Sequence, residues 1–306
     1  MPAPLHVLTG CTAVGKTELA LAWAERCDAE IVSCDALLFY RGMDIGTAKP
    51  SAAERARAPH HLIDVAEVDE RLDIKRYAEL ARAAVAAIEE RGRRVLVVGG
   101  SGFYLKSFLA PVADDVAVDP ALRAALDARL EGEGLRALVA ELRALNPGGF
   151  GALDVQNPRR VLRALERCLA SGATLEELAR RFAAQEPPYP GREVRVVELA
   201  REPDDLRARI GARVRAMLEA GLIEEVRTLR GWGLERNPSA ASAIGYRETL
   251  AWLDAGGDVA VLEAAITRNT WQLVRKQRTW FRTQLPAHRV VPLTGGGTAD
   301  VAGLFE

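Results

Sequence analysis

The chain has 306 residues, of which 49% are hydrophobic, enough to form one large or two modest domains around a sizeable core. Its 41 basic and 42 acidic residues nearly balance, so the net charge does not indicate whether the protein binds nucleic acid. The four cysteines form neither a Cys-x-x-Cys pair nor a cluster with zinc spacing. Since the N-terminus lacks a signal-peptide pattern and no apolar run approaches about 20 residues, we expect a cytoplasmic protein with reduced thiols and no membrane segment.

The first hundred residues predict alternating strands and helices. An apolar strand is expected at 5–10, a helix at 16–27 and a second buried strand at 30–35. A helix at 73–91 and a strand at 94–100 follow, the strand running into two glycines. This order predicts an α/β fold with a parallel sheet.

Beyond this segment the periodicity becomes helical. Helical patterns fill residues 120–181, with breaks at 146–151 and 171–174, and a proline-rich linker follows at 185–191. The rest predicts a strand at 193–200, one amphipathic helix at 203–230, a helix at 260–283 and a strand at 289–293. The simplest interpretation is an α/β core of residues 1–112 and 187–306, interrupted by a helical insertion at 113–186.

Residues 10–17, GCTAVGKT, match a phosphate-binding loop and lie between the first strand and the first helix. The glycines permit the turn, the backbone N–H groups face an anion, and the following helix adds its positive N-terminal end. Lys16 is expected to reach the phosphates and Thr17 to ligate Mg²⁺. The pattern alone does not say whose phosphates are bound.

Two further strands place polar residues at the same sheet edge. Asp35 ends the second strand, and Ser101 follows Gly99 and Gly100 at the end of the third. The Asp35 carboxylate is a candidate Mg²⁺ ligand, general base or turn cap, and spacing alone does not choose among these. Residues 39–50, FYRGMDIGTAKP, predict an ordered functional loop. His60 and His61 have no partner at metal-ligand spacing, so we expect structural, hydrogen-bonded histidines.

At this point the motifs resemble a known family, tRNA dimethylallyltransferase or MiaA. The resemblance covers residues 5–283 and rests on GCTAVGKTELA, DALLFYRGMDIGTAKP, PHHLID, VVGGSGFYL, IGYRETLAWL and RKQRTWFR. It implies transfer of a dimethylallyl group from its diphosphate to N6 of the adenosine 3′ of the anticodon, on the anticodon stem-loop of tRNA. The loop would then hold the donor's diphosphate rather than ATP.

The resemblance also implies roles for individual residues. Diphosphate would be bound by Gly10, Thr12, Ala13, Val14, Gly15, Lys16 and Thr17, with Thr17 on Mg²⁺. Asp35 would be the general base, and Ser101, where the family usually has Thr, would donate to the bridging oxygen as the carbon–oxygen bond breaks. The chain departs from the family pattern at Ala36, at residues 154–157 and at Trp271, which affects the expected tRNA preference rather than the reaction.

The resemblance further implies a set of tRNA-contacting residues. These are Asp35, Ala36, Leu37, Leu38, Ser101, Arg123, Arg159, Arg160, Val161, Leu162, Arg163, Ser242, Ala243, Ile244, Gly245, Tyr246, Arg247, Arg275, Lys276, Gln277, Arg278, Thr279, Trp280, Phe281 and Arg282. Residues 264–299 contain no Asp or Glu but several basic residues with interleaved aromatics, which favours RNA binding, although Trp280 and Phe281 themselves suit core packing. Residues 159–167 place arginines mostly on one side of a helix, which favours a basic face on the insertion.

Three other functions fit parts of the pattern. A small-molecule kinase would use the same loop on ATP and need no RNA. A prenyltransferase acting on free adenine nucleotide would not explain the insertion and the basic C-terminal region. An RNA-binding module with a vestigial loop would not explain intact Lys16, Thr17 and Asp35. We expect a monomeric enzyme.

Overall fold

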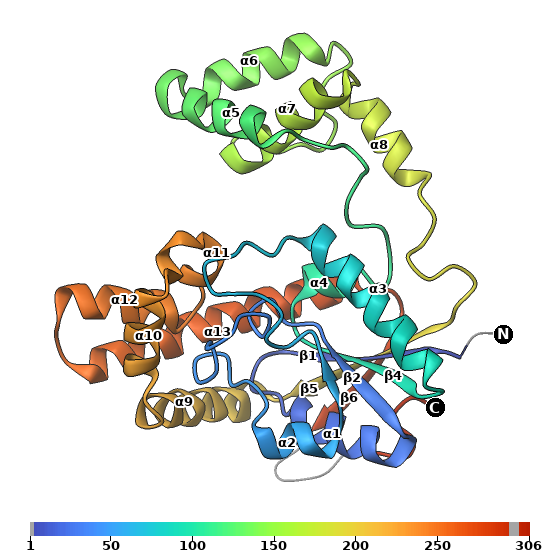
Figure 1. Ribbon diagram of the computed structural model, residues 1–306, viewed down its shortest axis with the longest axis vertical. Coiled ribbons are helices and arrows are strands. Elements are labelled where there is room, and N and C mark those ends of the chain that lie inside the picture. The colour runs from blue at the N-terminus through green and yellow to red at the C-terminus, as the bar shows by residue number, and fades with distance from the viewer. Residues whose placement is uncertain (1–2, 294–299) are drawn as a thin grey trace. The chain divides into compact units, whose positions relative to one another are not determined.

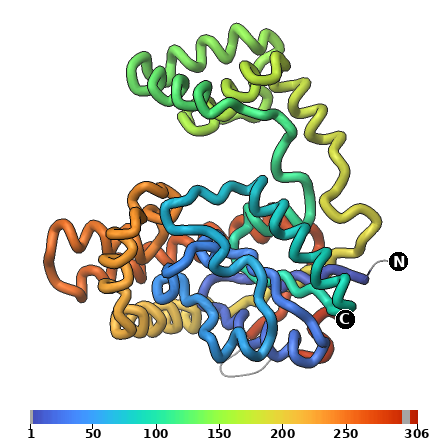
Figure 2. Tube along the Cα trace, in the orientation of Figure 1, coloured from blue at the N-terminus to red at the C-terminus, as the bar shows by residue number. Residues whose placement is uncertain are grey.

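The computed structural model describes residues 3–293 and 300–306 and consists of two compact units (Figure 1). The core unit comprises Met1–Ala110 and Tyr189–Glu306, and the insertion unit comprises Pro111–Pro188. The expected insertion, residues 113–186, lies within the second unit. The chain enters and leaves this unit through two segments without regular secondary structure (Figure 2). Among the residues described, no helix is long and apolar enough to cross a bilayer.

The core unit is built on one sheet of six parallel strands in the order β3-β2-β4-β1-β5-β6. The strands are β1 (Leu5–Gly10), β2 (Ala29–Ser33), β3 (His60–His61), β4 (Arg94–Val98), β5 (Val194–Arg201) and β6 (Arg289–Leu293). The predicted α/β class and parallel sheet are confirmed. The two-residue β3 was not predicted, because so short a strand has no period of its own.

Alternate residues of each strand face opposite layers of helices. Leu8 of β1 packs with Trp23 of α1 (Lys16–Cys27), in a cluster that also includes Phe305 near the C-terminus. Val7 packs on the other face with Tyr77 of α3 (Ile74–Glu90), next to α4 (Gly102–Lys106). Because both faces are covered, the strands are apolar on both sides, as expected for parallel strands.

A third apolar cluster joins the C-terminal helices to the loop that follows β2. The helices involved are α9 (Pro203–Glu219), α10 (Leu222–Gly231), the short η1 (Leu234–Arg236), α11 (Pro238–Ala241), α12 (Tyr246–Ala255) and α13 (Val259–Gln284). The short helix α2 (Ala52–Arg57) lies against α1 instead. The prediction of one helix at 203–230 is wrong. Gly221 has φ of 100°, a left-handed conformation that favours glycine, and it ends one helix and caps the next.

The insertion unit has its own apolar core, which includes Leu126, Leu138 and Leu165. Its helices are α5 (Pro120–Glu133), α6 (Leu135–Leu145), α7 (Pro158–Ser171) and α8 (Leu175–Ala183). The break at Gly134, with φ of 79°, was missed in the sequence. The Asn157 side chain accepts a hydrogen bond from the Arg160 N–H and so caps the start of α7.

Candidate active site

The phosphate-binding loop joins β1 to α1, as predicted. Gly10, Ala13 and Gly15 have φ of 145°, 63° and 107°, so the loop turns through three left-handed residues. A Cβ on Gly10 would lie 2.6 Å from the Leu199 carbonyl oxygen, which leaves no room for a side chain. Gly15 caps the start of α1, whose positive end therefore faces whatever the loop binds.

Lys16 folds back onto this loop. Its Nζ donates to the carbonyl oxygens of Gly10 at 2.8 Å and of Cys11 at 2.9 Å. Burial of the ammonium lowers the pKa of Lys16 to about 8, while the nearby Asp35 carboxylate opposes this shift. The lysine is thus held beside the cavity with a charge that an incoming anion would stabilise.

Two arginines that the sequence analysis did not identify as site residues hydrogen-bond to backbone carbonyl groups of the loop. The Arg201 Nε donates to the Val14 carbonyl at 2.7 Å, and the Arg209 Nε donates to the Ala13 carbonyl at 2.8 Å. They come from β5 and the following helix α9, far from the loop along the chain. No local pattern marks such residues, because their role depends on the sheet order that brings β5 next to β1.

Asp35 and Ser101 follow β2 and β4 at the same sheet edge. One Asp35 oxygen accepts from the Leu37 N–H at 3.1 Å, so the residue does cap a turn, as one interpretation proposed. Its carboxylate also interacts electrostatically with Lys16 and Arg213. Ser101 caps the start of α4, yet its hydroxyl makes no capping hydrogen bond and is free to meet a ligand.

Two cavities of the core unit meet at these residues. The loop cavity, of about 530 Å³, is lined by Gly15, Lys16, Thr17 and their surroundings. The Trp280 cavity, of about 510 Å³, is lined by Ser101, Trp280 and apolar side chains of α9 and α13. The residues that line both are Thr12, Asp35, Thr47, Gly100, Arg213 and Gln277. An anion bound in the loop cavity and a second ligand bound in the Trp280 cavity would therefore lie next to each other at Asp35.

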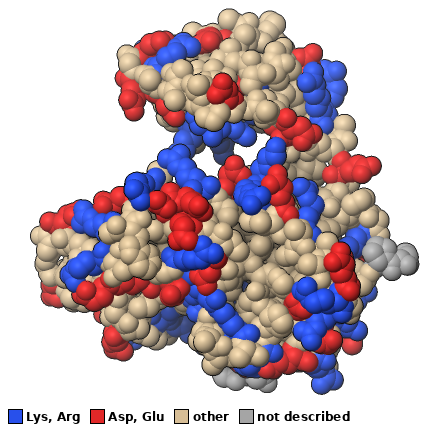
Figure 3. All heavy atoms as spheres, in the orientation of Figure 1, with Lys and Arg blue, Asp and Glu red and all other residues tan. Residues whose placement is uncertain are grey.

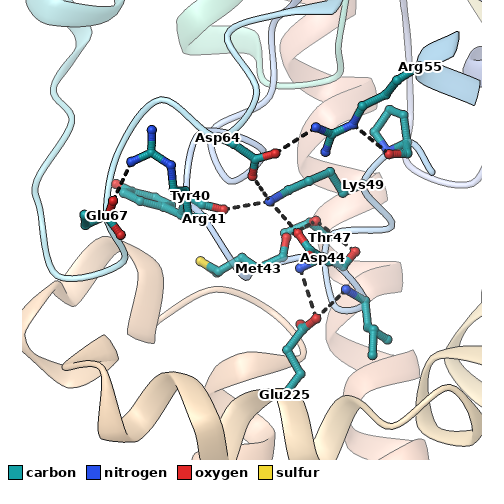
Figure 4. Close-up of polar contacts among 12 residues, drawn as sticks. Tyr40, Arg41, Met43, Asp44, Thr47, Lys49, Arg55, Asp64, Glu67 and Glu225 are labelled. Carbon is teal, nitrogen blue, oxygen red and sulfur yellow. Dashed lines mark hydrogen bonds and ion pairs between the residues drawn. The ribbon is translucent and has the colours of Figure 1, made fainter. Parts of the chain in front are cut away.

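The loop at 39–50 is held by a set of polar contacts (Figure 4). The Lys49 ammonium lies 2.6 Å from carboxylate oxygens of both Asp44 and Asp64 and donates to the Tyr40 carbonyl at 2.7 Å. The Glu225 carboxylate of α10 accepts from the N–H groups of Asp44, Ile45 and Gly46 at 3.0, 2.6 and 3.1 Å. The predicted ordered loop is confirmed.

This loop carries a contact into the junction between the cavities. The Thr47 carbonyl accepts from Arg213 Nη2 at 3.1 Å. Burial lowers the pKa of Arg213, and the Asp35 carboxylate opposes the shift. Arg213 is a cation at the junction that the sequence did not reveal, since it resembles any other arginine of an amphipathic helix.

The two histidines are held by hydrogen bonds, as predicted. His60 Nδ1 lies 2.7 Å from the Ala58 carbonyl oxygen, and His61 Nε2 lies 2.6 Å from the Glu30 carboxylate. Within the described residues, no group of three or more His, Cys, Asp and Glu side chains could hold a metal ion.

The predicted tRNA-contacting residues divide into three sets: those that line cavities or lie beside them, those that are buried in a core, and those that are charged or partly exposed. Those lining the Trp280 cavity are Asp35, Ala36, Leu37, Ser101, Ser242, Ala243, Ile244, Gly245, Lys276, Gln277 and Trp280, while Leu38 lines the loop cavity. Arg278, Thr279 and Arg282 line a different cavity beside β5, and Arg275 is exposed. Trp280 is half-buried and also packs against two core clusters, as expected for core packing, while another part of its side chain lines the cavity.

Three of these side chains are buried and offer no surface to an RNA. Val161, Tyr246 and Phe281 are 0%, 0% and 1% exposed. Val161 packs in the insertion core, and the Tyr246 hydroxyl donates to Glu225 at 2.6 Å. We assign these three side chains to the core instead.

The remaining predicted residues are charged or partly exposed. In the insertion unit Arg159 and Arg160 are exposed and Leu162 is half-buried, while Arg123 and Arg163 contact the buried Glu166 carboxylate at 2.7 and 3.3 Å. In the core unit Arg247 pairs with Glu248. An RNA would thus meet some cations that already have an acidic partner.

Comparisons with known proteins agree with this geometry. The model of the family described as IPP transferase matches residues 38–284. A tRNA dimethylallyltransferase from Opitutus terrae is 58% identical over 302 residues, covering 99% of this chain and 96% of the relative. Another from Chloroflexus aurantiacus is 42% identical over 279 residues, covering 91% of this chain and 92% of the relative.

A solved structure shares the fold over nearly the whole chain. The tRNA isopentenylpyrophosphate transferase from Bacillus halodurans aligns with a TM-score of 0.68 and 32% identity, covering 95% of this chain and 90% of that chain. The match of the family model to most of the chain, together with relatives of such high identity, goes beyond a shared fold. The chain therefore belongs to the IPP transferase family, and the resemblance to tRNA dimethylallyltransferases is confirmed.

Proposed function

We propose that the protein transfers a dimethylallyl group from dimethylallyl diphosphate to N6 of the adenosine that follows the anticodon of tRNA. The relatives from Opitutus terrae and Chloroflexus aurantiacus are named for a tRNA dimethylallyltransferase activity. The observation that carries the proposal is the shared wall of the two cavities, where Asp35 borders both an anion site and an apolar site.

The phosphate-binding loop holds the diphosphate of the donor. The N-terminus of α1 and Lys16 supply positive charge in the loop cavity, and Arg213 adds a cation at the junction. The prenyl tail then points along the apolar side chains Ile210, Val214 and Ile244. A polar ribose and base in this place would leave polar groups unpaired, at a cost of about 1–3 kcal/mol each.

The residues at the junction suit transfer to an amine. The N6 lone pair attacks the first carbon of the prenyl group, the carbon–oxygen bond breaks, and its electron pair stays on the diphosphate oxygen. The Asp35 carboxylate takes the proton that N6 loses, which matters because an adenine amine is a poor nucleophile. The free Ser101 hydroxyl donates to the oxygen on which charge develops.

Mg²⁺ fits the loop cavity by the chemistry of its donors. The exposed Thr17 hydroxyl and the Asp35 carboxylate both line the cavity, and hard oxygen donors are the ligands that Mg²⁺ prefers. Mg²⁺ usually combines one or two protein oxygens with phosphate oxygens and water, so a site without a cluster of carboxylates is suitable. The ion would neutralise charge on the diphosphate, with Thr17 as its protein ligand.

The target adenosine must leave its stack to reach Asp35. Enzymes that modify a base extrude it into a pocket, and the part of the Trp280 cavity lined by the Trp280 indole and the Lys276 cation would take the base, beside the apolar part that would take the prenyl tail. We propose that the protein acts as a monomer. We place this monomer in the cytoplasm with its tRNA, and light scattering of the protein at micromolar concentration tests the oligomeric state.

The test is direct. The protein is incubated with labelled dimethylallyl diphosphate, Mg²⁺ and unmodified tRNA, and the tRNA is digested to nucleosides. We expect label in N6-dimethylallyladenosine from one position of the anticodon loop. Label that stays out of the tRNA, or that appears on free adenine nucleotides instead, would sink the proposal.

A further inference from the structure

Gln277 of α13 lies between the phosphate-binding loop and the end of β4. Its Oε1 accepts from the Thr12 N–H at 3.1 Å, and its Nε2 donates to the Gly100 carbonyl at 2.8 Å. An N–H faces one end of the amide and a carbonyl faces the other, so only one orientation of the amide satisfies both. The side chain thus bridges two segments that are far apart in the sequence.

The contact with Gly100 acts directly on the residue that follows. The Gly100 carbonyl and the Ser101 N–H belong to one planar peptide unit, so a hydrogen bond to this carbonyl fixes the plane from which Ser101 continues. Space around Gly100 is also closed. A Cβ there would lie 2.8 Å from Gln277 Nε2, 3.0 Å from the Gly10 carbonyl and 3.5 Å from Lys16 Nζ.

The contact with Thr12 acts on the other partner in the reaction. Thr12 lies in the middle of the loop, and its N–H is occupied by Gln277 rather than by the loop itself. Gln277 lines both cavities, as Thr12 and Gly100 do. The amide therefore joins the segment that would hold the diphosphate to the segment that carries the Ser101 hydroxyl.

We propose that Gln277 is a positioning residue that keeps the phosphate-binding loop and Ser101 in register, so that the loop-bound diphosphate presents its bridging oxygen to the Ser101 hydroxyl. This inference rests on the proposed function and adds to it a role other than contact with tRNA. Gln277 exchanges no proton and touches no reacting atom. It acts through Ser101 and the loop.

The expected effect is on the rate of transfer rather than on binding. A misplacement of about 1 Å between reacting groups can lower a rate about 10²-fold. Gln277→Met keeps the length of the side chain and removes both hydrogen bonds. Gln277→Glu keeps the acceptor for Thr12 but sets an oxygen against the Gly100 carbonyl. The matched control is Gln272→Met, an exposed glutamine of the same helix.

The first measurement is a double-mutant cycle on kcat for prenyl transfer. We expect Gln277→Met to lower kcat about 10–100-fold, with tRNA affinity and donor KM changed less than about threefold, and Gln277→Glu to behave in the same way. In a Ser101→Ala background the same change should have little further effect, because coupled residues are not additive. Effects that multiply, or a loss confined to tRNA affinity, would overturn the inference.

The second measurement does not depend on prenyl transfer. Hydrogen–deuterium exchange of the donor-free protein should become faster in peptides covering 10–17 and 99–105 in Gln277→Met, and stay unchanged in Gln272→Met. Unchanged exchange at both segments in Gln277→Met would overturn the bridge itself. If the wild-type protein shows this bridge but prenylates no tRNA, the proposed function fails by itself and Gln277 loses its role toward Ser101.

Discussion

Asp35 holds a turn, and in the proposed reaction the same carboxylate is the general base. Its Oδ1 accepts from the Leu37 N–H at 3.1 Å and holds the turn after β2. Lys16 and Arg213 lie close enough to stabilise its charge electrostatically. The turn therefore holds the side chain where the two cavities meet, which is where the proposed reaction needs a general base for the adenine amine.

We predict that Asp35→Asn lowers the rate of prenyl transfer by about 10²–10⁴-fold, the usual contribution of a general base. The amide keeps the acceptor for Leu37 but cannot take the proton, so tRNA affinity should stay near that of the wild type. Single-turnover kinetics measures the rate of prenyl transfer, and a separate binding assay measures the affinity for tRNA. The control is Asp204→Asn, whose side chain is 97% exposed. Near wild-type turnover in Asp35→Asn would remove Asp35 from this role.

Lys16 predicts a pH dependence of donor binding. Its pKa of about 8 in the donor-free protein rises when a diphosphate fills the loop cavity, because the anion favours the ammonium. Between pH 8 and the pKa of the complex, binding takes up a proton, so affinity for dimethylallyl diphosphate falls as pH rises above 8.

Calorimetry at pH 9 in two buffers of different ionisation enthalpy measures this proton uptake. Lys16→Met should abolish the uptake that Lys16 contributes and weaken donor binding, since the charge-assisted contact is lost. Equal proton uptake in the wild type and in Lys16→Met would contradict the assignment.

At the scale of elements, the loop at 39–50 depends on α10. Glu225 accepts hydrogen bonds from three successive N–H groups and from the Tyr246 hydroxyl. A Cβ on Gly46 would lie 2.6 Å from the Tyr246 ring, so the loop is also closely packed. Through Thr47 this arrangement fixes the acceptor of Arg213.

We predict that Glu225→Gln destabilises the protein by about 1–3 kcal/mol, because an amide replaces one acceptor oxygen by a donor that faces other donors. The donor KM should rise as Arg213 loses its fixed partner. Urea unfolding and steady-state kinetics test both effects. Glu224→Gln, one residue earlier and exposed, should show neither. Identical behaviour of the two variants would show that Glu225 does not organise the loop.

We expect helix α7 to present a basic face of the insertion unit to the RNA. Arg160 is exposed at its first turn, and Arg163 contacts Glu166 at 3.3 Å. A cation that neutralises one RNA phosphate contributes about 0.7–0.9 to the slope of log K against log salt. The expected change in slope is simpler to interpret for Arg160, because Arg163 would exchange its ion pair with Glu166 for a contact with a phosphate.

We predict that Arg160→Ala and Arg163→Ala each weaken tRNA binding and reduce this slope by a little under one unit. Fluorescence anisotropy with labelled tRNA at several KCl concentrations gives the slopes. Arg180→Ala on α8 of the same unit is the control and should leave the slope unchanged. If neither α7 variant changes the slope, this helix does not face the RNA.

Elements with strong periodicity were predictable from the sequence, and glycine breaks were less so. The strands at 5–10 and 289–293 lie where the apolar pattern placed them, and α13 differs from its prediction by one residue at each end. Gly134 and Gly221 interrupt helical patterns whose apolar spacing continues on both sides. A single glycine inside a helix is tolerated, so the pattern alone does not show that the chain turns there.

At the scale of the whole molecule, the sequence predicted the motifs of the site but not its long-range contacts. The loop, Asp35 and Ser101 carry local signatures. The contacts of Gln277 to Thr12 and of Glu225 to Gly46 span 265 and 179 residues. The motif RKQRTWFR drew attention to Gln277 as a tRNA contact, but no local pattern shows that Gln277 or Glu225 makes these contacts, because the packing of α10 and α13 determines their partners.

The charges of the protein balance over the whole molecule, so only local groups of charged side chains can attract an RNA. Basic and acidic side chains are interspersed over the visible surface, in keeping with a net charge of −1 (Figure 3). An RNA must therefore be bound by local groups of cations rather than by the field of the whole protein. We expect the core unit to contribute such a group on α13 and the insertion unit to contribute one on α7.

We propose that the phosphate-binding loop serves a prenyl diphosphate and not ATP. The most direct measurement is tRNA prenylation with ATP as a competitor, combined with an assay for ATP hydrolysis. We predict that millimolar ATP inhibits weakly and is not hydrolysed, because its ribose and base would take the place of the prenyl tail along the apolar side chains Ile210, Val214 and Ile244. Strong inhibition by millimolar ATP, or hydrolysis of ATP that tRNA stimulates, would show that the loop serves ATP instead.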